Sequence, residues 1–124
     1  VGQGTSYLTS LAWSPDSTRL VIVGSQTIKL WNSASGHLVN PSLAQPGGGN
    51  AVAWSPDGQS IATARGKTIH IWEADTERTF SVLQTNAASG AVACVRWSPD
   101  GQSLAAGDSE RAVYIWPLEA FSSL

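Results

Sequence analysis

The sequence predicts an all-β protein built from three similar antiparallel sheets, and the prediction depends on three repeated features. A Trp-Ser-Pro-Asp motif occurs three times, beginning at Trp13, Trp54 and Trp97. A second tryptophan closes each copy, at Trp31, Trp72 and Trp116. The first tryptophan recurs after 41 and then 43 residues, and the second after 41 and then 44. This period is typical of the four-stranded blades of a β-propeller.

The first two strands of each repeat flank the Ser-Pro-Asp motif. A short apolar run ends at the motif tryptophan and predicts a strand over 8–13, 51–54 and 92–97. The motif itself suits a type I turn, in which proline fixes φ at the second position and glycine is favoured at the fourth. Ser17 holds the glycine position in the first repeat, and we expect the turn to accept it. A second strand follows over 19–23, 60–64 and 103–106.

The third strand ends at the second tryptophan, and its side chains alternate. Ile28 and Leu30 would lie on one face of the first sheet, with Lys29 and Trp31 on the other. Neither face is fully polar, which favours a blade covered on both sides by neighbours. A weaker fourth strand is expected over 37–39, 78–83 and 118–124. The chain 1–124 is thus predicted to be one three-blade unit, with repeats at roughly 5–42, 48–85 and 90–124.

Composition argues against several classes of partner. The seven basic residues are scattered and the net charge is −2, which disfavours a nucleic-acid partner or an anionic membrane surface. No apolar stretch approaches the roughly 20 residues of a membrane helix, and no secretory signal opens the chain. We therefore expect a cytoplasmic protein. The single cysteine, Cys94, excludes an intramolecular disulfide, and its apolar surroundings predict a buried thiol.

No residue pattern predicts catalysis, a metal site or a cofactor. His37 and His70 have no partner at metal or triad spacing. The segment 66–68, Gly-Lys-Thr, ends like a phosphate-binding loop but lacks the upstream glycine and the following helix. The segment 107–111 lacks the second glycine of a nucleophile elbow. We therefore expect a protein that is not an enzyme and has no catalytic, metal-binding or cofactor-binding residues.

Together these motifs resemble the WD-repeat (WD-40 type) family of β-propellers. The departures are specific: the residue after the closing tryptophan is Asn32, Glu73 or Pro117 in place of aspartate, and the family's Gly-His is absent before each first strand. The family's buried Trp–Ser/Thr–His–Asp hydrogen-bond network is therefore predicted to be incomplete. The resemblance implies a scaffold for protein or peptide partners.

The resemblance also implies which residues have which role. Partners of the family contact the face formed by the hairpins between second and third strands and the loops entering the first strand. The matching candidates are Tyr7, Gln26, Asn50, Arg65, Lys67, Glu110 and Arg111. Structural roles in blade packing and turn formation are expected for Trp13, Trp31, Trp54, Trp72, Trp97, Trp116, Asp16, Asp57 and Asp100.

Three blades are too few for a ring, since propellers usually have about four to eight. Both end sheets would then expose an apolar face. We expect copies to associate head to tail, a dimer giving six blades being favoured over a trimer giving nine. Further blades from a longer chain are the alternative. A small-molecule or glycan-binding propeller of the lectin type is the alternative function, although the mainly Ser, Ala and Gly loops favour a protein scaffold.

Overall fold

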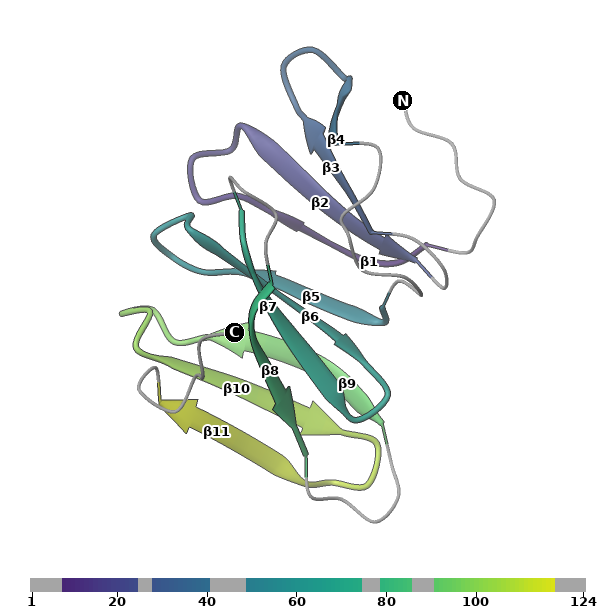
Figure 1. The fold of residues 1–124 in the computed structure, drawn as a ribbon, viewed down its shortest axis with the longest axis vertical. Coiled ribbons are helices and arrows are strands. Elements are labelled where there is room, and N and C mark those ends of the chain that lie inside the picture. Colours follow the sequence, from purple (N-terminus) through teal and green to yellow (C-terminus); the bar gives the residue numbers. More distant parts are fainter. Residues whose placement is uncertain (1–7, 25–27, 41–48, 75–78, 86–90, 118–124) are drawn as a thin grey trace.

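The computed structural model describes residues 8–24, 28–40, 49–74, 79–85 and 91–117, and these form three antiparallel sheets (Figure 1). Blade 1 contains β1 (Leu8–Trp13), β2 (Arg19–Gly24), β3 (Ile28–Asn32) and β4 (Leu38–Asn40). Blade 2 contains β5 (Ala51–Trp54), β6 (Ser60–Arg65), β7 (Thr68–Glu73) and β8 (Thr79–Gln84). Blade 3 contains β9 (Val92–Trp97), β10 (Ser103–Asp108) and β11 (Val113–Pro117).

Each sheet is a meander in which every strand pairs with the next strand along the chain. The all-β prediction is confirmed, and the fourth strands of blades 1 and 2 begin one residue later than predicted. The fourth strand expected over 118–124 lies outside the described residues. Among the described elements there is no helix long and apolar enough to cross a lipid bilayer.

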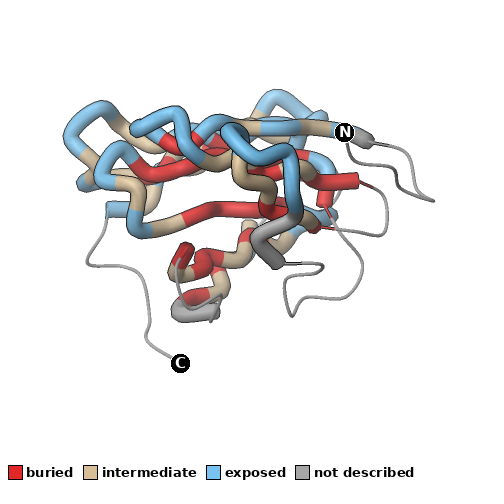
Figure 2. The backbone as a smooth tube through the Cα atoms, turned by 90° about the horizontal axis from the view of Figure 1, so that it is seen from above, coloured by how far each residue is buried: buried red, intermediate tan, exposed pale blue. Residues whose placement is uncertain are grey.

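The blades follow one another in chain order, with their first strands side by side (Figure 1). Strand β5 contacts both β1 and β9, so these three strands form one continuous wall. Figure 2 shows buried residues along the strands and exposed residues on the connecting turns. Blade 2 therefore lies between two neighbours, whereas blades 1 and 3 each have one among the residues that the structure describes.

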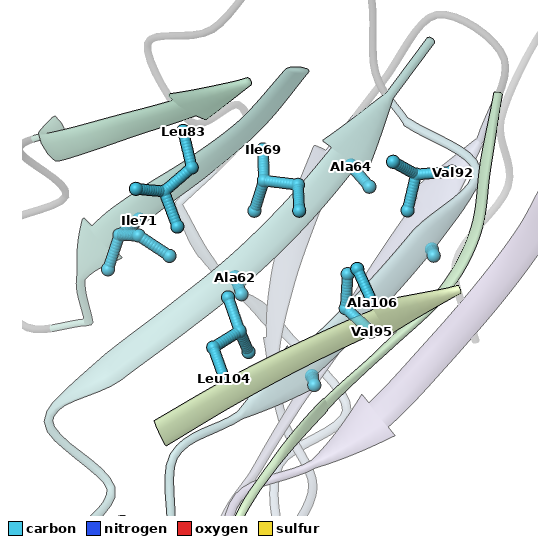
Figure 3. Packing of buried hydrophobic residues seen from close by; sticks show 11 residues of the cluster. Ala62, Ala64, Ile69, Ile71, Leu83, Val92, Val95, Leu104 and Ala106 are labelled. Atoms are coloured by element: carbon cyan, nitrogen blue, oxygen red, sulfur yellow. The ribbon is translucent and has the colours of Figure 1, made fainter. Parts of the chain in front are cut away.

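Two apolar clusters hold the blades together, and each uses one face of blade 2. The cluster between blades 1 and 2 consists of Val21, Val23, Ile28, Leu30, Val52, Trp54, Ile61, Trp72 and Ala74. The cluster between blades 2 and 3 consists of Ala51, Ala53, Ala62, Ala64, Ile69, Ile71, Leu83, Val92, Val95, Leu104 and Ala106 (Figure 3). The predicted burial of both faces of a blade is thus observed for blade 2.

The hydrogen-bond network predicted to be incomplete retains one bond in blade 2. The indole Nε1 of Trp72 donates to Thr63 Oγ1 at 2.8 Å, and both side chains are buried. Ile22 and Ala106 hold the position of Thr63 in the other blades, and neither has a hydroxyl. The buried Trp–Thr pair is therefore specific to the middle blade.

Replacing Thr63 by valine should destabilise the protein by about 1–3 kcal/mol, because the buried Trp72 indole loses its acceptor. Urea unfolding followed by circular dichroism measures this change. Thr63→Ser is the matched control, since it keeps the hydroxyl and should cost less. Equal losses in both variants would show that packing of the Thr63 methyl group, and not the hydrogen bond, makes the contribution.

Ser17 takes the expected position in the first turn with an unusual backbone conformation. Its φ is +65°, in the left-handed region, whereas the equivalent Gly58 and Gly101 have φ near +75° and +73°. The Ser17 and Gly58 amides each close the turn on the carbonyl of the first residue, Ser14 or Ser55, at 3.0 Å. The turn thus forms with serine at this position, as predicted, although an L side chain in this region carries backbone strain.

The substitution Ser17→Gly should stabilise the protein by about 1 kcal/mol. This is the difference between the backbone strain that glycine relieves and the conformational entropy that glycine adds to the unfolded chain. The reciprocal change Gly58→Ser in blade 2 should destabilise it by a similar amount. A Cβ at Gly58 would meet only Pro15 Cδ at 3.8 Å, an ordinary contact, so backbone strain dominates there. Thermal unfolding of both variants tests the pair, and shifts of the same sign would contradict it.

Candidate interaction face

One edge of the blades is tied together by backbone hydrogen bonds between consecutive repeats. The Gly49 amide donates to Gly24 O at 2.9 Å, which joins the β2–β3 hairpin to the entry of β5. The Val92 amide donates to Gly66 O at 2.8 Å and makes the same link between blades 2 and 3. The hairpins and the strand entries therefore form one connected surface, which we call the loop face.

The described candidates of the loop face are all exposed, and they come from two hairpins and one strand entry. Arg65 and Lys67 flank Gly66 in the β6–β7 hairpin, where φ of the glycine is +61°. Glu110 and Arg111 lie in the β10–β11 hairpin. The other two candidates, Tyr7 and Gln26, lie outside the described residues.

Asn50 links two blades as well as lying on the loop face. Its Nδ2 donates to Val92 O at 2.6 Å. Thr9, at the same position of the first repeat, donates from Oγ1 to Gly49 O at 2.8 Å. This bridging was not predicted from the sequence, although a polar residue at the same repeat position in blades 1 and 2 was the available signal. The third repeat has Ala93 there, which has no polar side chain.

Asp108 orders the hairpin that carries Glu110 and Arg111. Its Oδ1 accepts from the amides of Ala112 at 2.9 Å and Glu110 at 2.8 Å, and its Oδ2 accepts from the Tyr114 hydroxyl at 3.2 Å. The amide of Ala112, above all, lowers the pKa of Asp108 below its usual value. Arg111 lies within this turn with φ at +71°, so the side chains at its tip project from an ordered backbone.

The three recurring aspartates lie at the opposite edge of the blades, in the Ser-Pro-Asp turns. Asp16 Oδ1 accepts from the Thr18 hydroxyl and the Ser14 hydroxyl, both at 2.7 Å. The Ser14 oxygen in turn accepts from the amide of Arg19 at 2.9 Å. Equivalent serine hydroxyls donate to Asp57 at 2.5 Å and to Asp100 at 2.6 Å. Each carboxylate thus stabilises the turn that joins the first two strands of its blade.

These hydrogen bonds lower the pKa of all three turn aspartates. The Thr18 hydroxyl, followed by that of Ser14, lowers the pKa of Asp16 to about 2. The Ser55 hydroxyl lowers the pKa of Asp57, and the Ser98 hydroxyl lowers that of Asp100. The folded protein therefore binds these protons more weakly than the unfolded chain does.

Stability should be greatest above about pH 5 and should fall as the pH drops through about 4 toward 2, because the unfolded aspartates titrate near 3.9 and the folded ones lower. Urea midpoints measured across this range test the expectation. The variant Asp16→Asn should show a weaker dependence on pH, since one titrating carboxylate is removed. A midpoint that rises on acidification would contradict the assignment.

The first strands line a shallow cleft with a volume of about 400 Å³. Its wall includes one basic side chain, Arg96, one thiol, Cys94, and one hydroxyl, Ser10. No carboxylate is among the residues that line it, and the described residues include no cluster of His, Cys, Asp or Glu able to hold a metal ion. This wall contains no acid–base pair with which to activate a nucleophile.

Cys94 is exposed, so the prediction of a buried thiol was wrong. On its strand, β9, Val92 and Val95 pack against blade 2, and the two residues between them are exposed because the pairing of β9 with β10 shifts register there. Cys94 pairs with Gly107, which pairs in turn with Val113, and it lies on the opposite face, which has no described neighbour. The sequence identified the apolar stretch correctly, but it did not show that the Cys94 side chain lies on the uncovered face of the sheet.

The tryptophans that end the first strands connect consecutive blades. Trp54 Nε1 donates to Ala12 O at 3.1 Å, and Trp97 Nε1 donates to Ala53 O at 3.3 Å. The Arg19 guanidinium lies over the Trp54 ring, 5.0 Å from its centroid. Trp13 holds the same position in blade 1, before which the described residues form no other blade, and its side chain is 54% exposed.

Comparison with known proteins places these features in context. The sequence matches the family described as "WD domain, G-beta repeat" over residues 1–32, 47–73 and 79–117. No curated protein sequence matches it. The crystal structure of RRP9 WD40 repeats superposes with a TM-score of 0.85 at 23% identity, covering 99% of this chain and 39% of that one. The structure of the Kuenenia stuttgartiensis hydrazine synthase superposes with a TM-score of 0.85 at 14% identity, covering 100% of this chain and 36% of that one.

These likenesses show the fold, and they also show a difference in length. The chain spans less than two fifths of the length of either matched structure. The antiparallel sheets seen here thus correspond to a portion of each of those larger chains. At these identities the activities of the two neighbours do not carry over.

Proposed function

Because the chain belongs to the WD domain, G-beta repeat family, we propose that it is a non-enzymatic scaffold whose loop face binds a protein or peptide partner. Propellers of this family typically serve protein interactions and are generally non-enzymatic. The observation that supports the proposal most is the loop face itself, where backbone bonds between repeats hold exposed arginine, lysine and glutamate side chains on ordered hairpins. Such a prearranged surface loses little entropy on binding.

A peptide-display selection on the immobilised chain tests this proposal. Selected peptides should bind the unaltered protein, and the double variant Arg65→Ala/Arg111→Ala should weaken binding by at least about tenfold, as removal of interface anchors does. The matched control is Gln59→Ala/Gln102→Ala, which removes two exposed side chains from the opposite edge. Equal binding by both double variants would exclude the loop face. Selective binding to a glycan array would favour the lectin-type alternative.

We further propose that two copies of the chain complete one ring of six blades. Both end blades expose large apolar side chains, an arrangement that favours association. Light scattering on the chain of 13.0 kDa should therefore give about twice that mass. A monomeric mass at all concentrations would contradict the assembly but leave the loop face untouched.

We also propose a cytoplasmic location. With one cysteine the fold needs no oxidising compartment, since no intramolecular disulfide can form. Unchanged unfolding curves with and without a reducing agent would agree with this proposal. Fractionation of cells that express the tagged chain, with recovery outside the cytosol, would overturn it.

A further inference from the structure

The two ends of the blade stack each present an uncovered apolar face. Leu11 and Trp13 of blade 1 are 57% and 54% exposed, and Val113 and Ile115 of blade 3 are 72% and 68% exposed. These four are the large hydrophobic side chains that lie exposed in the described part of the chain. Two of them lie on the end face of blade 1 and two on the end face of blade 3, and these are opposite faces of the repeated sheet.

The exposed face of blade 3 is equivalent to the face of blade 1 that packs on blade 2 and to the face of blade 2 that packs on blade 3. Val113 and Ile115 hold the repeat positions of Ile69 and Ile71, which are 0% exposed beneath blade 3. The same positions in blade 1, Ile28 and Leu30, are buried beneath blade 2. The end face of blade 3 is therefore half of an interface that the chain already forms twice.

The face of blade 1 is the other half of that interface. Leu11 and Trp13 correspond to Val52 and Trp54, which are buried against blade 1. They also correspond to Val95 and Trp97, which pack against blade 2. The two end faces therefore have the same relation to each other as the faces already joined within the chain.

Side-chain sizes also match across the two ends. Blade 1 turns Val21 and Val23 toward its successor, and blade 2 turns Ala62 and Ala64, whereas blade 3 offers the smaller pair Ala105 and Gly107. On the receiving side the equivalent residues are Ile22 in blade 1, Thr63 in blade 2 and Ala106 in blade 3. Ile22 is the largest of the three. The smallest presenting face would thus meet the largest receiving residue, as close packing requires.

A polar bond recurs at each internal interface and has a counterpart at the ends. The motif tryptophan of one blade donates to the carbonyl of the residue before the motif tryptophan of the preceding blade, as Trp97 does to Ala53. For Trp13 the equivalent acceptor is Arg96 O of a blade 3.

We propose that the occupant of both end faces is a second copy of this chain, joined in the register of the internal interfaces. In each seam, blade 3 of one copy packs on blade 1 of the other, and Trp13 Nε1 donates to Arg96 O across it. The interface is heterologous, and two equivalent seams close the pair. This inference rests on the proposed two-copy ring and specifies which faces form it.

Cys94 provides a reporter for the seam. It holds the repeat position of Ala51, which is 4% exposed beneath blade 3, whereas Cys94 itself is exposed in the single chain. Because it is the only thiol in the sequence, its reaction with Ellman's reagent reports on this face alone. Closure of the seam should slow that reaction by about tenfold or more relative to the dissociated chain, since thiol reactivity follows access.

Two charge substitutions test the pairing of the faces. Trp13→Asp and Ile115→Asp should each abolish the dimer mass and expose Cys94 to the reagent. Mixing the two variants should restore a 1:1 pair, because one seam then joins an intact blade 3 to an intact blade 1. Glu110→Lys, on the loop face of blade 3, is the matched control and should leave the mass unchanged. Circular dichroism establishes that each variant is folded.

The outcomes separate this inference from the proposed assembly. The seam is supported if each single variant has the mass of a monomer, if mixing the variants restores the dimer mass, and if Cys94 is protected in the dimer. A dimer in which Cys94 reacts freely, or in which either variant keeps its mass, overturns the seam but leaves two-copy assembly standing. A trimer overturns the two-copy occupant. A monomer with reactive Cys94 overturns both, and the end faces would then await blades from another chain.

Discussion

Truncating Ile71 to alanine should lower the free energy of unfolding by about 2–5 kcal/mol, a large share of the roughly 5–15 kcal/mol typical of a whole domain. Ile71 is fully buried on β7, on the face of blade 2 that packs against blade 3 (Figure 3). Its loss opens a cavity in the cluster that joins the two blades. Relaxation there is limited, because alanines already bring the backbones close together.

Urea unfolding followed by tryptophan fluorescence and by circular dichroism measures the effect of Ile71→Ala. Gln59→Ala is the control, because its exposed side chain lies in the turn of the same blade and should change stability by less than about 0.5 kcal/mol. A loss below about 1 kcal/mol for Ile71→Ala would mean that the interface between blades 2 and 3 is not close-packed.

Substituting Gly49 by alanine should cost about 1–3 kcal/mol, the usual range when a side chain is forced into a packed site. A Cβ at this position would lie 2.9 Å from the backbone oxygen of Ala64, so close that the backbone must shift to accommodate it. The Gly49 amide also donates to Gly24 O, so a shift of the backbone would weaken the link between blades 1 and 2.

The control for Gly49→Ala is Gly36→Ala. Gly36 has φ at +74° and open space around its Cβ position, so alanine there meets only backbone strain of about 1 kcal/mol. Thermal unfolding should rank Gly49→Ala as the less stable variant. The reverse order would show that the loop entering β5 can move away from β6 without loss.

The sequence predicted the strands well and the environment of particular residues less well. Three aligned repeats locate the turns, and proline and glycine chemistry marks where each strand stops, so seven of the eight observed strands with both bounds predicted lie within one residue of those bounds. The remaining strand, β10, extends two residues beyond its prediction, to Asp108. The family resemblance indicated the hairpins and strand entries that form the loop face, and the binding of a partner there stays a prediction.

What the sequence could not supply is the identity of each residue's neighbours. Alternation along β9 separates Val95 from Cys94, but it does not reveal which of the two faces is covered. The left-handed backbone at Ser17 follows a type I turn and depends on the register of the next strand, not on its own residue type. Asn50 was assigned to the surface because its acceptor, Val92 O, comes from the next repeat, 42 residues along the chain.

The sandwiched position of blade 2 has a consequence for how the molecule comes apart. A row of blades that touch only their neighbours behaves as a one-dimensional array with nearest-neighbour coupling. Blade 2 takes part in two couplings, and each end blade takes part in one within the chain. Native-state hydrogen exchange on the dissociated single chain should therefore find the slowest amides on β6 and β7, with the end blades fraying before global unfolding. Addition of a blade at either end would raise protection of the former end blade alone.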